Sequence, residues 1–341
     1  MFSWALWQDA FTVFMGILIE ATPFVLLGVL LSSLLHQFVK AETLIKLIPK
    51  NRFLAILAAC SLGFLFPVCE CGNVPVARGL IRKGVEPYIA IAFLLSAPVF
   101  NPVVIFATYA AFKAQPEIIY GRLGLTFIVV FVTASLFSLV KNPQALLQSR
   151  VFEKASPAPL GKPVAAGLAM ASGGGTFQIR RGKSEKGGAA QGQIFSLEQN
   201  VRAETNNPWM MFFDRAIHEF FEMGGTLVIG AFIASVIQVQ VPRGILLGVG
   251  SDPVLSVVAM LVLAVLVSIC STVDAFFALS YSSTLTGGGI LAFLVFGPLI
   301  DIKGVVQLLT TFSIKTVVWL SITTGLLAFT LCIAYNFYGG F

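Results

Sequence analysis

Charged side chains are scarce in this sequence. Asp, Glu, Lys and Arg make up 11% of its 341 residues, against roughly 25% in a soluble globular domain. That is too few to cover a surface that faces water, so an ordinary water-soluble domain is excluded. Hydrophobic residues account for 57% of the chain, as expected of a protein whose outer surface contacts lipid.

Several other signatures are missing. There is no P-loop or other nucleotide-binding motif, there are only two histidines, and the five cysteines suggest no disulfide framework. Met1–Ala10 lacks the basic region of a secretory signal, so we expect the apolar run after it to be a membrane span. We therefore expect no cofactor, no nucleic-acid partner, and the lipid bilayer as the surroundings of the chain.

Long apolar runs take the place of these features. Phe11–Leu35, Tyr88–Phe112 and Leu123–Val140 are long enough to cross a ~30 Å hydrocarbon core, which needs about 20 residues. In lipid every backbone polar group must be paired within the protein, so these runs are helices. The sequence therefore predicts an all-α, polytopic membrane protein.

A polar segment divides the chain into two hydrophobic halves. It is rich in Gly, Ser, Ala, Gln and Pro and contains nine Lys and Arg residues between Lys141 and Arg202. Such a composition cannot bury enough apolar surface to fold alone. We expect a first transmembrane repeat at 1–140, a disordered basic linker at 141–211 and a second transmembrane repeat at 212–341.

The two halves resemble each other at three places, in the same order. The matches are Glu20, Gly28 and Ser33 with Glu222, Gly230 and Ser235, then 67–73 with 268–274, then 96–101 with 296–301. The offsets between the matched positions are 202 (222 − 20), 201 (268 − 67) and 200 (296 − 96). Ordered matches with so small a drift indicate an internal duplication.

Positive charges in the loops predict how the halves are oriented. Each half has four hydrophobic segments. If all four crossed, the basic loop Lys40–Arg52 and the basic linker would lie on opposite faces, against the positive-inside rule. If the second segment of each half enters and returns on one side, both lie in the cytoplasm, and the outer face keeps only Lys113, Arg122 and Arg243. Three crossings per half is an odd number, so we expect two inverted repeats with both termini outside.

The second segments, 53–83 and 254–285, contain signals for an interruption. Pro67–Pro75 is polar and bounded by prolines, and Cys270–Asp274 is its counterpart, followed by a returning segment at 275–284. Prolines also interrupt the third segments. Inverted repeats with interrupted helices that meet near the bilayer midplane are a recurring transporter design. The sequence therefore predicts a re-entrant or broken hairpin in each repeat.

The interruptions bring polar residues into the membrane interior. Ionisable groups there cost at least about 2.5–3.5 kcal/mol and persist mainly with a partner, a water path or a task. The candidate substrate-binding or coupling residues are Cys69, Glu70, Cys71, Asn73 and Asn101 from the first half, Cys270, Ser271, Thr272, Asp274 and Asp301 from the second, and the matched acids Glu20 and Glu222. Asp301 is close enough in sequence to pair with Lys303. The functional interpretation is a substrate or proton site, and the structural one is an ion pair that clamps two helices.

Cys69 and Cys71 flank Glu70 in the segment predicted to be irregular, where both thiols can point to one atom. Thiolates suit soft metals such as Zn and Cu(I), and trivalent arsenic belongs with them. Cys270 offers a third sulfur from the other half. The spacing is not that of a structural zinc site and no histidine lies nearby, so we expect no resident metal. The alternative is that these small residues permit close backbone packing.

Two motifs resemble those of a known family. Phe66–Ala77 (FPVCECGNVPVA) and Leu94–Val103 (LLSAPVFNPV) are similar to motifs of the ArsP/YraQ-like predicted permeases, and the resemblance covers both hydrophobic halves. It implies a multi-pass permease of the bacterial inner membrane. Characterised ArsP-type members export trivalent organoarsenicals, which implies that Cys69 and Cys71 engage a soft substrate.

The leading hypothesis is a secondary transporter or efflux pump, rather than an enzyme, that moves a small molecule or ion through a site between the repeats. Carboxylates at that site would couple transport to an ion gradient. Two other functions stay open: a membrane thiol–disulfide enzyme that uses Cys69 and Cys71, and a passive channel whose filter is the polar breaks. A second copy of the chain or an accessory subunit is a candidate partner.

Overall fold

The computed structural model describes residues 4–38, 48–49, 51–65, 69–140, 143–148, 208–240, 252–282 and 284–338. Within these ranges the regular elements are helices, apart from one isolated β-bridge between Leu147 and Phe312. The all-α prediction is confirmed. Most of the basic loop Lys40–Arg52 (residues 40–47 and 50) and most of the proposed linker, 149–207, lie outside the described residues.

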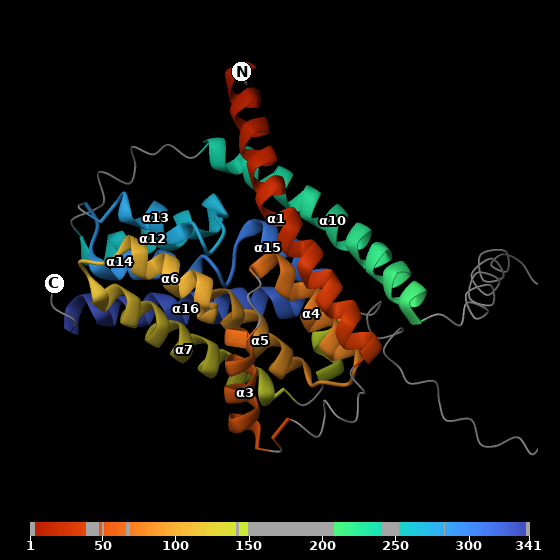
Figure 1. The fold of residues 1–341 in the computed structure, drawn as a ribbon. Helices are drawn as coiled ribbons and strands as arrows, with labels where there is room; N and C mark the ends of the chain where they lie inside the picture. Colours follow the sequence, from red (N-terminus) through yellow and green to blue (C-terminus); the bar gives the residue numbers. More distant parts are fainter. Residues whose placement is uncertain are drawn as a thin grey trace, which may run out of the picture.

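The helices follow the same order in both halves (Figure 1). The first half contains α1 (Trp4–Phe38), α3 (Arg52–Leu65), α4 (Glu70–Arg82), α5 (Pro87–Phe100), α6 (Pro102–Ala111) and α7 (Pro116–Ser138), followed by the 3-10 turn η1 (Pro143–Leu146). The second contains α10 (Pro208–Gln240), α12 (Pro253–Val267), α13 (Asp274–Leu279), α14 (Gly287–Phe296), α15 (Ile302–Leu308) and α16 (Ile314–Tyr338). Helix ends keep the offsets of the sequence matches: α1 and α10 end at positions matched by the first offset, and α6 and α15 begin at positions matched by the last.

Among the described residues, five helical stretches are long and apolar enough to cross a membrane. They are Leu6–Leu35, Pro87–Ala111, Pro116–Ser138, Phe212–Gln240 and Ile314–Tyr338. Three shorter apolar helices, Arg52–Phe64, Pro253–Val267 and Gly287–Phe296, accompany them. The chain is therefore a multi-pass membrane protein. The stretch expected to match Pro87–Ala111 is divided into α14 and α15, and neither helix alone reaches the length of a span.

The centre of the molecule is formed by α5 and α14. Nearly every residue of both helices is buried, and both are apolar on all sides, the pattern of a helix enclosed by other helices. Around them, α3 and α7 pack against α5, while α12 and α16 pack against α14. Contact between α7 and α16 joins the two halves.

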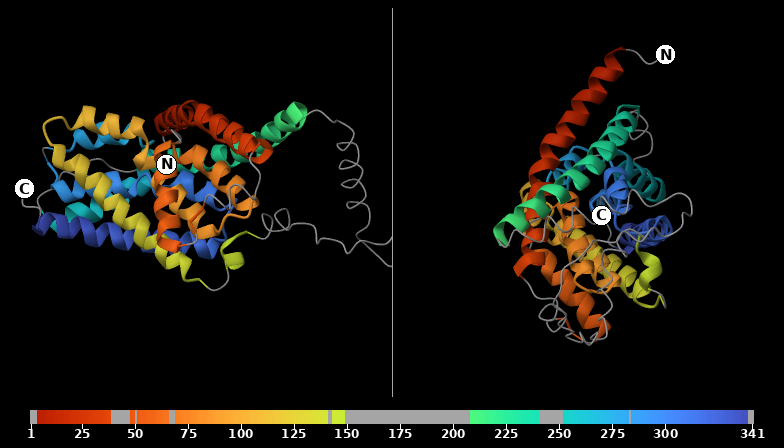
Figure 2. Two further views of the ribbon diagram at one scale, coloured as in Figure 1. Left: turned by 60° about the horizontal axis from the view of Figure 1, so that its bottom comes forward. Right: turned by 90° about the vertical axis from the view of Figure 1, so that its right-hand side faces the viewer.

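The two long helices α1 and α10 lie side by side across one face of this assembly (Figures 1 and 2). Beneath them, α1 packs on α4 and α10 packs on α15. Matched glycines make these approaches close, as small residues do where membrane helices meet. A Cβ atom on Gly28 would collide with the backbone of Gly72, and one on Gly230 would lie 3.1 Å from the Cα of Lys303.

Both predicted interruptions are present in the described residues, and the first ends earlier than expected. Because α4 begins at Glu70 and contains Pro75, the prediction of an irregular Pro67–Pro75 is wrong for residues 70–75. Membrane helices tolerate an internal proline when neighbouring groups satisfy the freed carbonyl. In the second half, the chain leaves helical geometry between α12 and α13, and α13 ends at Leu279, well before the predicted end of the returning segment.

Candidate functional site

The two breaks place a cysteine just before a helix in the same backbone arrangement. The carbonyl of Cys69 accepts hydrogen bonds from the N–H groups of Gly72 and Asn73, at 3.1 and 3.2 Å. The carbonyl of Cys270, its counterpart in the second half, accepts the equivalent two bonds at 3.0 and 3.0 Å. Cys69 thus directly precedes α4, and Cys270 precedes the turn that leads into α13.

A second matched pair of residues, Asn101 and Asp301, caps the N-termini of α6 and α15. The side chain of Asn101 accepts a hydrogen bond from the N–H of Val103 at 2.9 Å, and that of Asp301 accepts one from Gly304 at 2.7 Å. Asn and Asp are favoured N-cap residues because they satisfy N–H groups that the helix leaves open. Asn101, a predicted site residue, thus serves its own helix α6.

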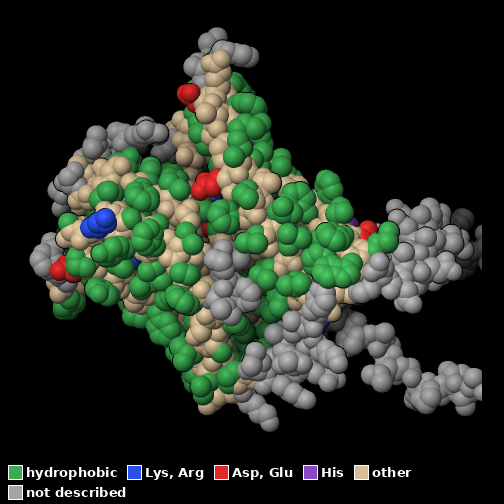
Figure 3. Space-filling view, viewed as in Figure 1, with side chains coloured by type: hydrophobic (Ala, Val, Ile, Leu, Met, Phe, Trp, Pro, Cys, Tyr) green, Lys and Arg blue, Asp and Glu red, His purple; other side chains and the backbone are tan. Residues whose placement is uncertain are grey.

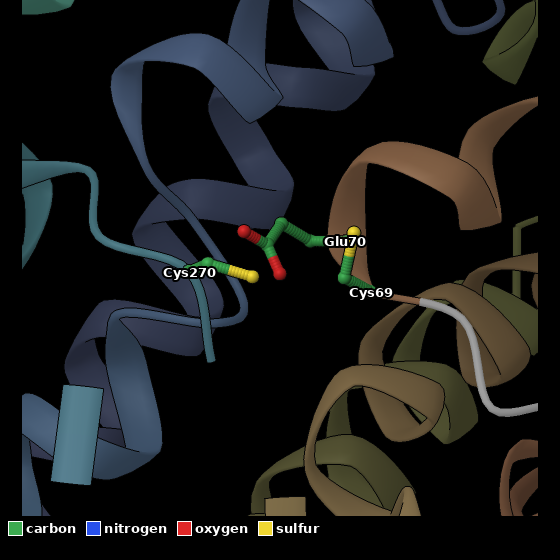
Figure 4. Close-up of side chains that lie close together, drawn as sticks. All are labelled: Cys69, Glu70 and Cys270. Atoms are coloured by element: carbon green, nitrogen blue, oxygen red, sulfur yellow. The ribbon is translucent and has the colours of Figure 1, made fainter. Parts of the chain in front are cut away.

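The central cluster is formed by Cys69, Glu70 and Cys270. Their two sulfurs and a carboxylate oxygen all lie within 4.8 Å of one another, and none of the three residues is exposed. Figure 4 shows the Glu70 carboxylate reaching toward Cys270 from the start of α4. The thiol of Cys71 lies beside that of Cys69. The sulfurs that meet across the two halves are therefore those of Cys69 and Cys270, and Cys71 is adjacent.

Hydroxyl groups after the second break complete this cluster. The Ser271 hydroxyl donates to the Glu70 carboxylate at 3.4 Å, and the Thr272 hydroxyl donates to the sulfur of Cys270 at 3.6 Å. Both residues were predicted to belong to the site. The second break thus supplies a thiol and the Ser271 hydroxyl to the first, and Thr272 supports the thiol of Cys270.

Lys303 joins the predicted residues of both halves. Its Nζ lies 3.1 Å from Oε1 of Glu70 and 3.5 Å from Oδ2 of Asp301, and it donates to the carbonyl of Ser268 at 2.9 Å. Ser268 ends α12 with a left-handed backbone (φ 46°). The sequence pointed to the Asp301 pair but not to Glu70, which lies in the other half. Two carboxylates, one from each half, therefore lie beside one ammonium.

Asp274 belongs to a separate buried ion pair. Arg122 donates to its two carboxylate oxygens at 2.7 and 3.0 Å and to the Thr108 hydroxyl at 2.8 Å. Such a bidentate Arg–carboxylate pair is among the strongest polar contacts in proteins. Arg122 is buried in α7 and paired with Asp274 rather than exposed in a loop. The sequence did offer a signal for this ion pair, because Arg122 and Asp274 each lie within a predicted hydrophobic segment.

Two buried amides have no hydrogen-bond partner among the described residues. Asn73 in α4 and Gln307 in α15 are both fully buried, and neither amide oxygen nor amide nitrogen is paired. Leaving a buried polar group unpaired costs about 1–3 kcal/mol. Asn73 was a predicted site residue, whereas Gln307 was not.

The matched acids Glu20 and Glu222 have different surroundings. Glu222 pairs with Arg78 of α4 at 2.7 Å. One turn earlier in α10, Glu219 lies 3.7 Å from Arg82 and accepts a hydrogen bond from Ser32 of α1 at 3.1 Å. This network holds α10 and α1 on α4. Glu20 is half-buried and forms no ion pair with a described residue.

Comparison with known proteins agrees with this arrangement. The family ArsP_1, described as a predicted permease, matches residues 6–337, which include both breaks and the central cluster. The chain belongs to this permease family. The resemblance drawn from the Cys69–Cys71 and Asn101 motifs is thereby confirmed.

Relatives of this permease family extend over nearly the whole chain. UPF0718 protein YcgR of Bacillus subtilis is 38% identical over 312 residues, covering 92% of this chain and 91% of its own length. A putative two-component membrane permease complex subunit of Streptococcus mutans is 30% identical over 321 residues, covering 94% and 93%. UPF0718 protein YraQ of Escherichia coli is 30% identical over 96 residues, covering 28% of each chain. No solved structure matches significantly.

Proposed function

We propose that this permease is a secondary transporter or efflux pump in which a small thiophilic solute crosses the membrane through a site made by Cys69, Glu70 and Cys270. One observation carries the proposal: two thiols and a carboxylate, contributed by the two halves of the chain, converge inside the protein. Ionisable groups at such positions are functional candidates by default.

The architecture we propose is a pair of inverted repeats, 1–140 and 212–341, each with three crossing helices and a broken or re-entrant second segment. The repeated helix order supports it. So does the exchange of half-helices: α4 of the first half packs on α15 of the second, and α13 of the second packs on α6 of the first. The positive-inside rule puts the basic linker 141–211 in the cytoplasm and, for a bacterial permease, the chain in the inner membrane.

The donor set of the site suits soft electrophiles. Sulfur ligands prefer thiophilic centres, and a trivalent organoarsenical such as methylarsenite has two hydroxyl groups that thiols can replace. Cys69 and Cys270 would each exchange with one hydroxyl and release one water molecule, and the reverse exchange would free the solute. Glu70, Asp301 and Asp274 are the carboxylates proposed to couple the cycle to an ion gradient.

The structure weighs against the thiol–disulfide enzyme. An enzyme that exchanges disulfides with proteins needs thiols that a protein substrate can reach, whereas all five cysteines are buried. A partner is better supported, because the Streptococcus mutans relative is named as a subunit of a two-component complex. We propose that this chain also works with a second subunit.

Transport through the thiol pair is testable in proteoliposomes that contain the purified full chain. Because each thiol supplies a soft ligand, we expect Cys69→Ser or Cys270→Ser to reduce methylarsenite accumulation by about tenfold or more. Cys60→Ser and Cys332→Ser are matched controls, since these buried cysteines lie in α3 and α16, and they should leave accumulation unchanged.

Equal accumulation by wild type and both site variants would show that the thiols do not carry the solute. Accumulation against a gradient would exclude a passive channel, whereas equilibration alone would support one.

A further inference from the structure

Four helices follow the breaks and pack as two pairs, α4 with α15 and α6 with α13. The long helices α1 and α10 cover only the first pair. The covered face consists of α4 and α15, on which no residue is exposed, because α1 and α10 lie over it. The uncovered face consists of α6 and α13 and the residue before α13. Its exposed hydrophobic side chains are Val103, Phe106, Tyr109, Val273, Phe276 and Leu279. Figure 3 shows hydrophobic side chains over this side of the molecule, where α6 and α13 lie in Figure 1.

The internal repeat relates the two faces to each other. The offset that matches 67–73 with 268–274 makes α13 the counterpart of α4, and the offset that matches 96–101 with 296–301 makes α6 the counterpart of α15. The same offsets apply to the points where α1 and α10 touch the covered face. The counterpart of Gly72, which Gly28 contacts, is Val273, and the counterpart of Lys303, which Gly230 contacts, is Val103. Both valines are open, at 45% and 53% exposure.

We infer that the uncovered face is a second docking surface for this chain's own α1–α10 pair, an inference that rests on the inverted repeats of the proposed function. After the exchange, Gly28 lies on Val103 and Gly230 on Val273. The pair then leaves the N-terminal turns of α4 and α15 and covers those of α6 and α13. Because the Cys69–Glu70–Cys270 cluster lies where the break before α4 meets the break before α13, this exchange moves the cover from one side of the site to the other.

The forces at the two faces make such an exchange feasible. Between membrane helices there is little hydrophobic driving force, because lipid tails are as apolar as the side chains. Exchanging one apolar helix contact for another therefore changes the packing energy little. The difference lies in polar contacts: the covered face offers Arg78 to Glu222, whereas the counterpart of Arg78 on the uncovered face is Leu279. The ion pairs hold the pair of helices on the covered face at rest.

The repeat also supplies matched reporter positions. A Cβ atom on Gly79 of α4 would lie 3.7 Å from the Cβ of Ser32 in α1, within the roughly 3.5–4.5 Å that a disulfide requires. The counterparts of Ser32 and Gly79 are Ala234 of α10 and Ser280, which follows α13 and is exposed here. A disulfide between positions 234 and 280 thus reports the second docking position, as one between 32 and 79 reports the first.

The experiment oxidises the full-length chain in native membranes with copper phenanthroline and maps disulfides by mass spectrometry. We expect Ser32→Cys/Gly79→Cys and Ala234→Cys/Ser280→Cys each to form an intramolecular disulfide. A variant that carries only one of the two substitutions of a pair should not form that disulfide. In the variant that carries all four substitutions, oxidation first traps one pair, and no chain carries both disulfides. Formation of the 32–79 disulfide without any 234–280 product would overturn the inference.

A second copy of the chain is the competing occupant, and the test separates it. Differently tagged Ala234→Cys and Ser280→Cys chains are co-expressed and oxidised. A disulfide between the two chains would assign the uncovered face to a partner copy and overturn the inference. Failure of this inference can be told apart from failure of the proposed function. Unchanged methylarsenite transport by the Cys69→Ser variant would refute the substrate site, and both intramolecular disulfides would still form.

Discussion

Replacing Lys303 by methionine should lower the free energy of unfolding by about 3–5 kcal/mol, because removing one partner of a buried ion pair leaves the other charge uncompensated. Here two carboxylates, those of Glu70 and Asp301, lose the same ammonium. Lys315→Met is the matched control. Lys315 is exposed near the start of α16, and a change there should stay within about 0.5 kcal/mol.

The measurement is equilibrium unfolding of the purified variants in mixed micelles of mild detergent and dodecyl sulfate. Neutralising the partners provides a second reading: Glu70→Gln and Asp301→Asn, added to Lys303→Met, should recover most of the loss, since no unpaired charge is left buried. If Lys303→Met unfolded like Lys315→Met, the three groups would not form a buried cluster across the two halves.

Replacing Arg122 by methionine should cost a similar amount, about 3–5 kcal/mol, for the same reason. Asp274 would keep a buried charge and lose both hydrogen bonds from the guanidinium, and Thr108 would lose its donor. The paired variant Arg122→Met with Asp274→Asn removes both charges and should be the more stable of the two. Arg52→Met, at an exposed arginine, is the control for loss of an arginine side chain.

A double-mutant cycle on Arg122 and Asp274 gives the coupling directly. We expect a coupling free energy above about 1 kcal/mol, the range found for residues in contact. Additive effects of the two single substitutions would contradict the pair.

Much of the fold follows from local features of the sequence. The scarcity of charge and the lengths of the apolar runs determine the class of protein, because lipid permits neither exposed charge nor unpaired backbone. The repeated matches from Glu20 to Asn101 predict which elements correspond. Cys69, Glu70, Cys270 and Asp301 were then expected together, since matching breaks would meet near the midplane.

What the sequence does not reveal are contacts between distant elements. The sequence analysis counts Arg122 among the loop charges. Its partner Asp274 lies in the other half of the chain, and nothing near Arg122 in the sequence indicates that pairing. The pairing of Glu70 with Lys303 is hidden for the same reason, since the two residues belong to different halves of the chain. Pro75 indicates a helix break, although a buried membrane helix can absorb it.

The unequal cover of the two faces also lies beyond the sequence. The matched glycines Gly28 and Gly230 indicate close helix contact, but not which face they contact. In the structure Gly28 packs on α4 and Gly230 packs on α15. The matched helices α13 and α6 have no such cover, so the two halves are arranged asymmetrically. In transporters built from inverted repeats, alternating access is largely a rigid-body movement of one unit against another, and an asymmetric resting arrangement is what such a movement requires.

The meeting of the two breaks is tested most directly by oxidising the Cys71→Ser chain in native membranes and mapping its disulfides by mass spectrometry. This background removes the thiol next to Cys69, so Cys270 is the sulfur within reach. The account predicts a disulfide that joins Cys69 to Cys270 across the two halves. A product in which both cysteines stay separately alkylated, while Ser32→Cys/Gly79→Cys forms its disulfide under the same conditions, would contradict it.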